Sequence, residues 1–271
     1  LAIKIFKDEY PKRFLHQLIS SQLDMDRLDY LRRDSFFTGV TEGNIGSARI
    51  IKMLNVVDDN LVVDSKGIYS IENYLTSRRL MYWQVYLHKT TVGYEKLLVN
   101  LLSRAKYLAD QGETVFATPA LHFFLYNHIN KEAFVDNAEP LQHYKMLDDS
   151  DIWASVKAWT THRDPILSLL SRNLIDRRIF KVEVRSTVVE EAEVMDIRHQ
   201  IAQRYGLSFD DTAYLVNVST IRKDMYDIHD DHISILYKDG TIKDITEASE
   251  ILNISLLSKK ICKYYLCYQR F

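Results

Sequence analysis

The most informative stretch of the sequence is rich in charges of both signs: Asp24-Met25-Asp26-Arg27-Leu28-Asp29-Tyr30-Leu31-Arg32-Arg33-Asp34. It holds four carboxylates and three arginines in eleven residues. On a helix that advances ~100° per residue, one face carries Asp26, Tyr30, Arg33 and Asp34. This face combines an oxygen that suits a metal, an aromatic ring, a cation that suits phosphate and an acceptor that suits a sugar hydroxyl. A solvated face with ion pairs between successive turns explains the same spacing, so both interpretations stay open.

A second polar stripe follows about fifty residues later along the chain. Arg78, Tyr82, Tyr86 and Lys89 fall at helical spacing on one predicted face. Arginine and lysine bind phosphate oxygens, and tyrosine packs on flat groups. The stripe therefore suits a phosphorylated ligand that carries a ring or a sugar. A half-buried tyrosine ridge with cations reaching to solvent is the alternative.

Outward from these two stripes, the hydrophobic spacing predicts helices up to about residue 175 and a mixed pattern beyond it. Glycines at positions 39, 43 and 46 interrupt the helical pattern, and the segment 61–67 predicts a short hairpin. The predicted long helices cover 70–90 and 92–110, and shorter ones lie within 119–172. Beyond them we expect strands at 180–184, 214–218, 233–242 and 261–268, with a helix at 188–204. The predicted fold class is mainly α, with a helical portion over 1–175 and a small α+β domain over 176–271.

The composition is typical of a soluble globular protein. The chain has 271 residues, 46% of them hydrophobic and 27% charged, with a net charge of −2. Nothing in this balance indicates nucleic acid or an anionic membrane as a partner, and no apolar run approaches the roughly 20 residues of a membrane helix. The two cysteines, Cys262 and Cys267, predict free thiols in a reducing cytoplasm. Because the sequence opens at Leu1 with a pattern typical of the inside of an ordered element, we expect it to be part of a longer chain.

Two motifs carry a family resemblance. The run from Ser20 to Asp34, with the letters SSQLDMDRLDYLRRD, resembles the late motif of HD-domain deoxynucleotide triphosphohydrolases of the dGTPase type. The segment Tyr86-Leu87-His88-Lys89 resembles their downstream Tyr-x-His-Lys element. The resemblance covers about residues 10–110, and it implies a helical bundle of the HD type.

The resemblance also implies roles for individual residues. In the family, one divalent metal is held by a His, a His-Asp pair and a distant Asp, and Asp26 matches that last Asp. The family pattern then places Arg27 on phosphate, Tyr30 and Asp34 on the sugar and its 3′-hydroxyl, Arg78 and Lys89 on the triphosphate, and Tyr86 beneath the sugar, where it disfavours a 2′-hydroxyl. Tyr82 belongs to the same expected substrate-binding set, although family members carry a histidine there.

The implied activity is metal-dependent hydrolysis of deoxynucleoside triphosphates to deoxynucleoside and triphosphate. The first His and the His-Asp pair should precede Asp26, where this chain has only His16. We therefore expect no complete catalytic set here and no activity from this chain alone. The pair His229-Asp230 follows Asp26 instead, and we expect it in a polar loop that shares no cavity with Asp26. The family further implies a homo-oligomer, a dimer or a tetramer.

Two other functions fit the same residues. One is an HD phosphohydrolase that acts on another phosphorylated substrate. The other is a nucleotide-binding regulatory protein without catalysis. The preferred base, the metal and any allosteric nucleotide are not indicated by the residues.

Overall fold

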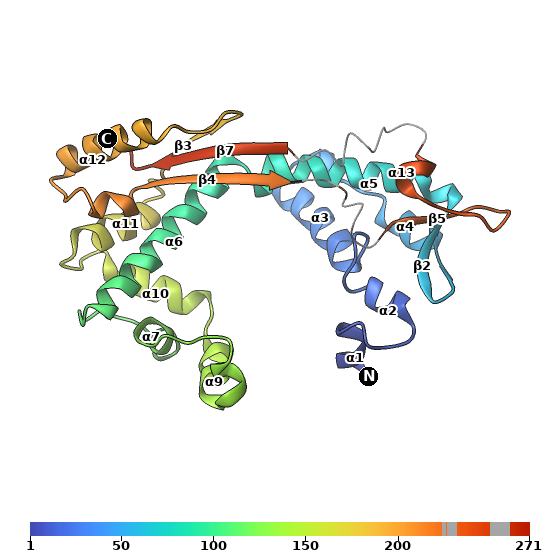
Figure 1. The fold of residues 1–271 in the computed structure, drawn as a ribbon, viewed down its shortest axis with the longest axis horizontal. Helices are drawn as coiled ribbons and strands as arrows, with labels where there is room; N and C mark the ends of the chain where they lie inside the picture. The colour runs from blue at the N-terminus through green and yellow to red at the C-terminus, as the bar shows by residue number, and fades with distance from the viewer. Residues whose placement is uncertain (224–225, 227–231, 250–260) are drawn as a thin grey trace. The chain divides into compact units, whose positions relative to one another are not determined.

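The computed structural model of the protein describes residues 1–223, 226, 232–249 and 261–271. These residues form a mainly helical structure with two small sheets, and most of the strands follow residue 180 (Figure 1). The predicted fold class, helices first and a mixed α+β region after them, is confirmed. None of the helices in these residues is long and apolar enough to cross a membrane.

The chain divides into two compact units. The first unit contains residues 1–88 and 221–262, and the second contains residues 89–220 and 263–271. This division differs from the predicted one at residues 175 and 176. The physical reason is that a compact unit is defined by which elements pack together, whereas the prediction followed a change in hydrophobic period. Strands after residue 220 complete a sheet that begins before residue 65.

The first unit combines short helices with a four-stranded sheet. Its helices are α1 (Ala2–Phe6), α2 (Arg13–Gln17), α3 (Met25–Thr38), α4 (Ser47–Met53), α5 (Ile68–Met81) and α13 (Ile245–Ala248), with 3₁₀ turns η1 (Thr41–Gly43) and η2 (Ser65–Gly67) and a π-helical turn η3 (Tyr82–Tyr86). The sheet order is β1 (Leu54–Val57), β2 (Asn60–Asp64), β5 (Ser234–Leu236) and β6 (Ile242–Asp244). Strands β2 and β5 are parallel, and the other two pairings are antiparallel.

Helix α3 carries the first polar stripe, and its two ends have clear local causes. Asp24 is the N-cap, and its side chain accepts a hydrogen bond from the backbone N–H of Arg27 at 2.7 Å. Gly39 ends the helix with a φ of 71°, in the left-handed region that glycine adopts without steric cost. Leu28 and Leu31 are buried in the core of the first unit. The opposite face of α3 is thereby left for the polar side chains.

The hairpin of the first unit begins earlier in the chain than predicted. Strands β1 and β2 pair from Leu54 with Val63 to Val57 with Asn60. The two turn residues between them, Asp58 and Asp59, have φ of 47° and 58°. A two-residue hairpin turn with positive φ matches the twist of the strands, and aspartate tolerates that conformation. The segment 65–67, predicted as part of a hairpin over 61–67, is the 3₁₀ turn η2.

The second unit is built around the long helix α6 (Lys89–Asp110). Further helices follow: α7 (Pro119–Tyr126), α8 (Ala133–Asp136), α9 (Ala138–Met146), α10 (Asp149–Trp159), α11 (Pro165–Ile175) and α12 (Glu191–Tyr205), with the 3₁₀ turn η4 (Asp211–Tyr214). The three-stranded sheet has the order β3 (Lys181–Arg185), β7 (Ile261–Tyr268) and β4 (Val216–Lys223). Gly93 of α6 lies close to β3, since a Cβ atom there would be 2.8 Å from Cγ2 of Val182.

A buried ion-pair network joins three elements of the second unit. Arg104 of α6 contacts Asp164, the N-cap of α11, at 2.6 Å and Asp211 of η4 at 2.8 Å. Its guanidinium also lies 5.1 Å from the ring centroids of both Tyr107 and Tyr214. The Arg104 side chain is 8% exposed, so its charge depends on these partners for stabilisation.

Candidate substrate site

The two polar stripes of the sequence meet in the first unit at a hydrogen bond. The phenol of Tyr86, in η3, donates to Oδ2 of Asp34, in α3, at 2.7 Å. The Tyr86 ring also makes an edge contact with the Tyr30 ring, at a centroid distance of 6.0 Å and an interplanar angle of 76°. Tyr82 makes a similar contact with Tyr86, at 5.4 Å and 77°. Three tyrosines and one carboxylate therefore form a single cluster, called here the tyrosine cluster.

Cationic side chains border the tyrosine cluster. The guanidinium carbon of Arg78 lies 6.0 Å from the ring centroid of Tyr82, a cation–π distance. Burial and the neighbouring Tyr82 raise the pKa of Tyr30, while the positive charges of Arg78 and Arg27 oppose this rise. Both arginines thus act electrostatically on the same phenol. The cluster therefore combines rings, a carboxylate acceptor and two cations within one compact unit.

The phenol of Tyr86 is a hydrogen-bond donor at neutral pH. Burial and the hydrogen bond to Asp34 raise the pKa of Tyr86 well above its usual value. A protonated phenol offers one donor and retains acceptor capacity. Tyr86 uses its donor on Asp34, which fixes one oxygen of that carboxylate. The other oxygen, Oδ1, can accept from a ligand hydroxyl.

Asp26 lies apart from these contacts. It is exposed, on the first turn of α3. Within residues 1–223, 226, 232–249 and 261–271, no group of three or more His, Cys, Asp or Glu side chains could hold a metal ion. The role of Asp26 as a metal ligand stays a prediction. Arg33, on the same predicted face, is exposed and pairs with Asp29 at 3.1 Å, as a solvated helix face would.

Lys89 belongs to the second unit. It opens α6 after the chain has left the helical path at Leu87 and His88, so the helical spacing from Arg78 does not extend to it. It lines a pocket of about 210 Å³ with six other residues, among them Lys181 and Arg270. Its predicted contact with the substrate of Asp34 and Tyr86 stays a prediction. The pair His229-Asp230 lies outside the described residues.

Two contributors to this region were not assigned from the sequence. Asp24 is buried and pairs with the guanidinium of Arg27 at 3.3 Å. Tyr74 is fully buried, and its phenol donates to the backbone oxygen of Gln22 at 2.6 Å. The spacing contained a signal for the second residue, because Tyr74 lies one helical turn before Arg78 and extends its stripe.

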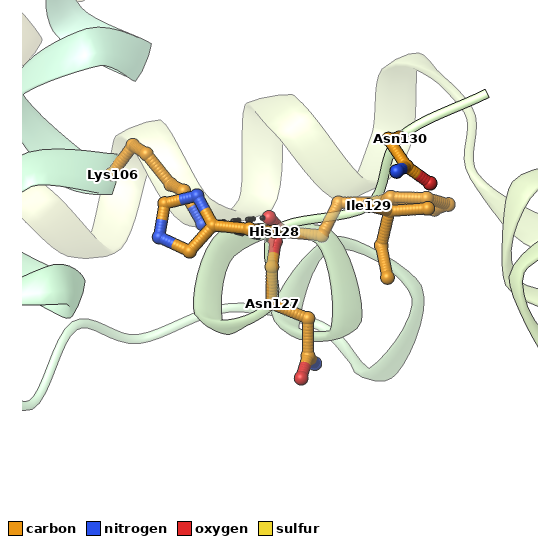
Figure 2. Close-up of a pocket in the computed structure, with 6 residues that line it drawn as sticks. Lys106, Asn127, His128, Ile129 and Asn130 are labelled. Carbon is orange, nitrogen blue, oxygen red and sulfur yellow. Dashed lines mark hydrogen bonds between the residues drawn. The ribbon is translucent and has the colours of Figure 1, made fainter. Parts of the chain in front are cut away.

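The second unit holds a separate pocket of about 470 Å³ at the end of α7 (Figure 2). Its lining residues are Lys106, Phe124, Asn127, His128, Ile129 and Asn130. Nζ of Lys106 donates to the backbone oxygens of Leu125 at 2.9 Å and Asn127 at 3.0 Å, and His128 pairs with Asp110 at 3.1 Å. A lysine that binds carbonyls at a helix C-terminus stabilises that helix, so these contacts account for Lys106 structurally.

Comparisons with known proteins agree with this fold. The model of the HD associated region matches residues 45–114, which include α5, η3 and α6 up to its end. A crystal structure of a phosphohydrolase from Bacteroides thetaiotaomicron is similar to 99% of this chain and 67% of its own, with 64% identity and a TM-score of 0.95. YwfO of Bacillus subtilis is 32% identical over 98% of this chain and 60% of its own.

A shorter segment of the chain is similar to a nucleotide hydrolase. A deoxynucleoside triphosphate triphosphohydrolase SAMHD1 homolog from Dictyostelium discoideum is 26% identical over 97 residues, which are 35% of this chain and 19% of that protein. The chain spans 60% or less of the length of the curated relatives that it matches.

The helical fold and the match over residues 45–114 identify a mainly helical protein that contains an HD-associated region. The chain belongs to the phosphohydrolase family of the Bacteroides thetaiotaomicron protein.

Proposed function

We propose that the complete protein hydrolyses deoxynucleoside triphosphates to a deoxynucleoside and triphosphate. The observation that carries the proposal is the hydrogen bond between Tyr86 and Asp34, at 2.7 Å. It unites the two motifs that resemble the family and places a hydroxyl acceptor beside aromatic rings. The printed name of the Dictyostelium relative supports the same class of substrate.

Each part of a nucleotide has a partner in this proposal. Oδ1 of Asp34 accepts a hydrogen bond from the 3′-hydroxyl of the sugar, while the phenol of Tyr86 donates to the other carboxylate oxygen. The rings of Tyr30 and Tyr86 pack against the sugar, because tyrosine offers an apolar face with a polar edge. Arg27 and Arg78 offset the phosphate charge in the low-dielectric surroundings of a half-buried site, and Lys89 and Tyr82 complete the predicted set.

The divalent metal is part of the proposal only through Asp26, as one of its ligands. The chemistry that such a metal supplies, polarisation of a phosphate and activation of water, requires further ligands besides Asp26. We expect this chain alone to show no turnover. We also propose that the complete protein works as a homo-oligomer, which light scattering would measure.

The test is a substrate panel with the complete protein. Deoxynucleoside triphosphates, ribonucleoside triphosphates and simple phosphate esters are incubated with added divalent metals, and triphosphate and phosphate are quantified separately. Release of triphosphate from deoxynucleotides supports the proposal. Release of phosphate from other esters would identify a phosphohydrolase with another substrate. Tight binding of nucleotides without any product would indicate a regulatory protein.

A further inference from the structure

Asp24 stands at the point where α3 begins and joins two tasks in one side chain. Its Oδ1 accepts from the backbone N–H of Arg27 at 2.7 Å, which caps the helix. Its Oδ2 lies 3.3 Å from Nε of the Arg27 side chain and also accepts from the backbone N–H of Ser21 at 3.3 Å. The carboxylate therefore fixes both the backbone and the side chain of the same arginine.

The burial of this pair makes the arrangement informative. The Asp24 side chain is 8% exposed and that of Arg27 is 27% exposed. A carboxylate removed from water needs a nearby positive charge and hydrogen bonds, and Arg27 with two backbone N–H groups meets that need. An uncompensated carboxylate at this place would repel a phosphate, so its pairing with Arg27 also matters for the ligand.

The geometry leaves part of the arginine for a ligand. A guanidinium has five N–H donors in a fixed planar fork, and the contact with Asp24 uses Nε. Its two terminal nitrogens can bind phosphate oxygens in a bidentate manner. Arg33, on the solvated face of the same helix, pairs with the exposed Asp29 at 3.1 Å, and an ion pair in water restrains a side chain weakly.

A second contact secures the position of Asp24 itself. The phenol of Tyr74, on α5, donates to the backbone oxygen of Gln22 at 2.6 Å, two residues before the cap. Helix α5 also carries Arg78, one turn after Tyr74. The start of α3 is therefore tied to the helix that supplies the other arginine.

We propose that Asp24 is a positioning residue, which holds the Arg27 guanidinium by Nε so that its terminal nitrogens receive the phosphates of the substrate. The proposal rests on the proposed function, because it deepens the role of Arg27 there. Asp24 touches no substrate in this arrangement. It acts through Arg27, by reducing the number of side-chain conformations that arginine can adopt before the substrate binds.

The test uses Asp24→Asn in the complete protein. Asparagine caps a helix as well as aspartate does, so it keeps an oxygen for the Arg27 backbone and removes the charge that holds the guanidinium. Misplacement of a positioning group costs up to about a hundredfold, and we expect kcat/KM for deoxynucleoside triphosphates to fall about ten- to a hundredfold. A higher KM should account for most of the loss. Thermal unfolding, measured beside the kinetics, should show some loss of stability, because the Asp24 side chain is 8% exposed, but the variant should stay folded at the assay temperature.

The matched control is Asp29→Asn on the same helix. This substitution removes one carboxylate charge from an exposed pair with Arg33, whose side chains are 62% and 55% exposed. We expect kinetics within about twofold of the unmodified protein, since exposed ion pairs contribute little.

A double substitution then separates this proposal from the proposed function. In a protein that already carries Arg27→Ala, adding Asp24→Asn should cause no further loss, since both act through one contact. Additive losses would overturn the positioning role, as would Asp24→Asn kinetics that match Asp29→Asn while Arg27→Ala is impaired. If Arg27→Ala itself retains full activity, the phosphate contact of the proposed function fails, and the role of Asp24 fails with it.

Discussion

Tyr86 and Asp34 lie 52 residues apart in the sequence and are joined by a hydrogen bond of 2.7 Å. The bond connects η3 to α3 and gives the Asp34 carboxylate one fixed oxygen. Neither motif alone specifies this relationship, yet it determines where a hydroxyl could be accepted. The first prediction concerns this pair.

Replacing Tyr86 in two ways should separate its ring from its phenol. Tyr86→Phe keeps the ring and loses a hydrogen bond to a charged group, which contributes about 1.5–3 kcal/mol, so we expect at least a tenfold lower kcat/KM with discrimination against ribonucleotides retained. Tyr86→Ala should also lose that discrimination. The measurement is the ratio of kcat/KM for matched deoxy- and ribonucleotides. An unchanged ratio in Tyr86→Ala would contradict the role of the ring.

Asp26→Ala should abolish hydrolysis by the complete protein and leave its stability almost unchanged. Loss of a metal ligand should cost at least the 10–100-fold typical of groups that only support ligands. Asp26 is exposed, and surface substitutions usually change stability by less than about 0.5 kcal/mol. Triphosphate release and thermal unfolding measure the two effects, with Asp29→Ala as the control on the same helix. Full activity of Asp26→Ala would remove the metal assignment.

Because of the ion pairs of Arg104, we expect the free energy of unfolding to depend on pH. Burial alone would raise the pKa of Asp164, but hydrogen bonds from Arg104 and from the backbone of Leu167 hold it below its usual value. A carboxyl whose folded pKa is depressed contributes stability above the pKa of the unfolded chain, about 4. That contribution is lost as the pH falls through the folded value. Asp164→Asn should therefore remove part of the acid sensitivity that appears as the pH falls below about 4.

The same substitution should lower the free energy of unfolding at neutral pH by about 3 kcal/mol, near the lower end for breaking a buried pair. Asp211 still contacts Arg104 at 2.8 Å and limits the loss. Urea unfolding at several pH values measures both effects. The control is Asp211→Asn, which should cost less because Asp211 is 29% exposed and Asp164 is 10% exposed. A larger loss from Asp211→Asn would contradict this ranking.

Gly93→Ala should destabilise the second unit although alanine favours helices. The new Cβ atom would lie 2.8 Å from Cγ2 of Val182, so β3 or α6 must shift, at a cost of about 1–3 kcal/mol. Ser103→Ala, at an exposed position of the same helix, reports the effect of helix propensity alone. Equal unfolding free energies for the two variants would show that α6 and β3 separate easily.

Much of the local structure could be predicted from the residues. The helical stripe of α3, the break at Gly39 and strand β3 follow from periods of 3.6 and 2 and from the conformational freedom of glycine. The second stripe was predictable only as far as Tyr86, because the π-helical turn and the start of α6 at Lys89 end the regular spacing. Strand β1 was missed, since its four residues are too few for a period to be visible.

The sequence by itself therefore determined most of the helices, the strands of the later part of the chain and the two polar stripes as far as Tyr86, because these depend on residues a few positions apart. Only the tertiary structure decided that β2 pairs with β5, that Arg104 meets Asp164 and Asp211, and that Tyr86 meets Asp34. Such contacts join residues far apart in the chain, and their free energy comes from burial and packing, which no local pattern specifies. The contact between Asp24 and the Arg27 guanidinium depends on both. The cap joins residues three positions apart, whereas the burial of the Asp24 carboxylate, which strengthens its ion pair with Arg27, comes from tertiary packing.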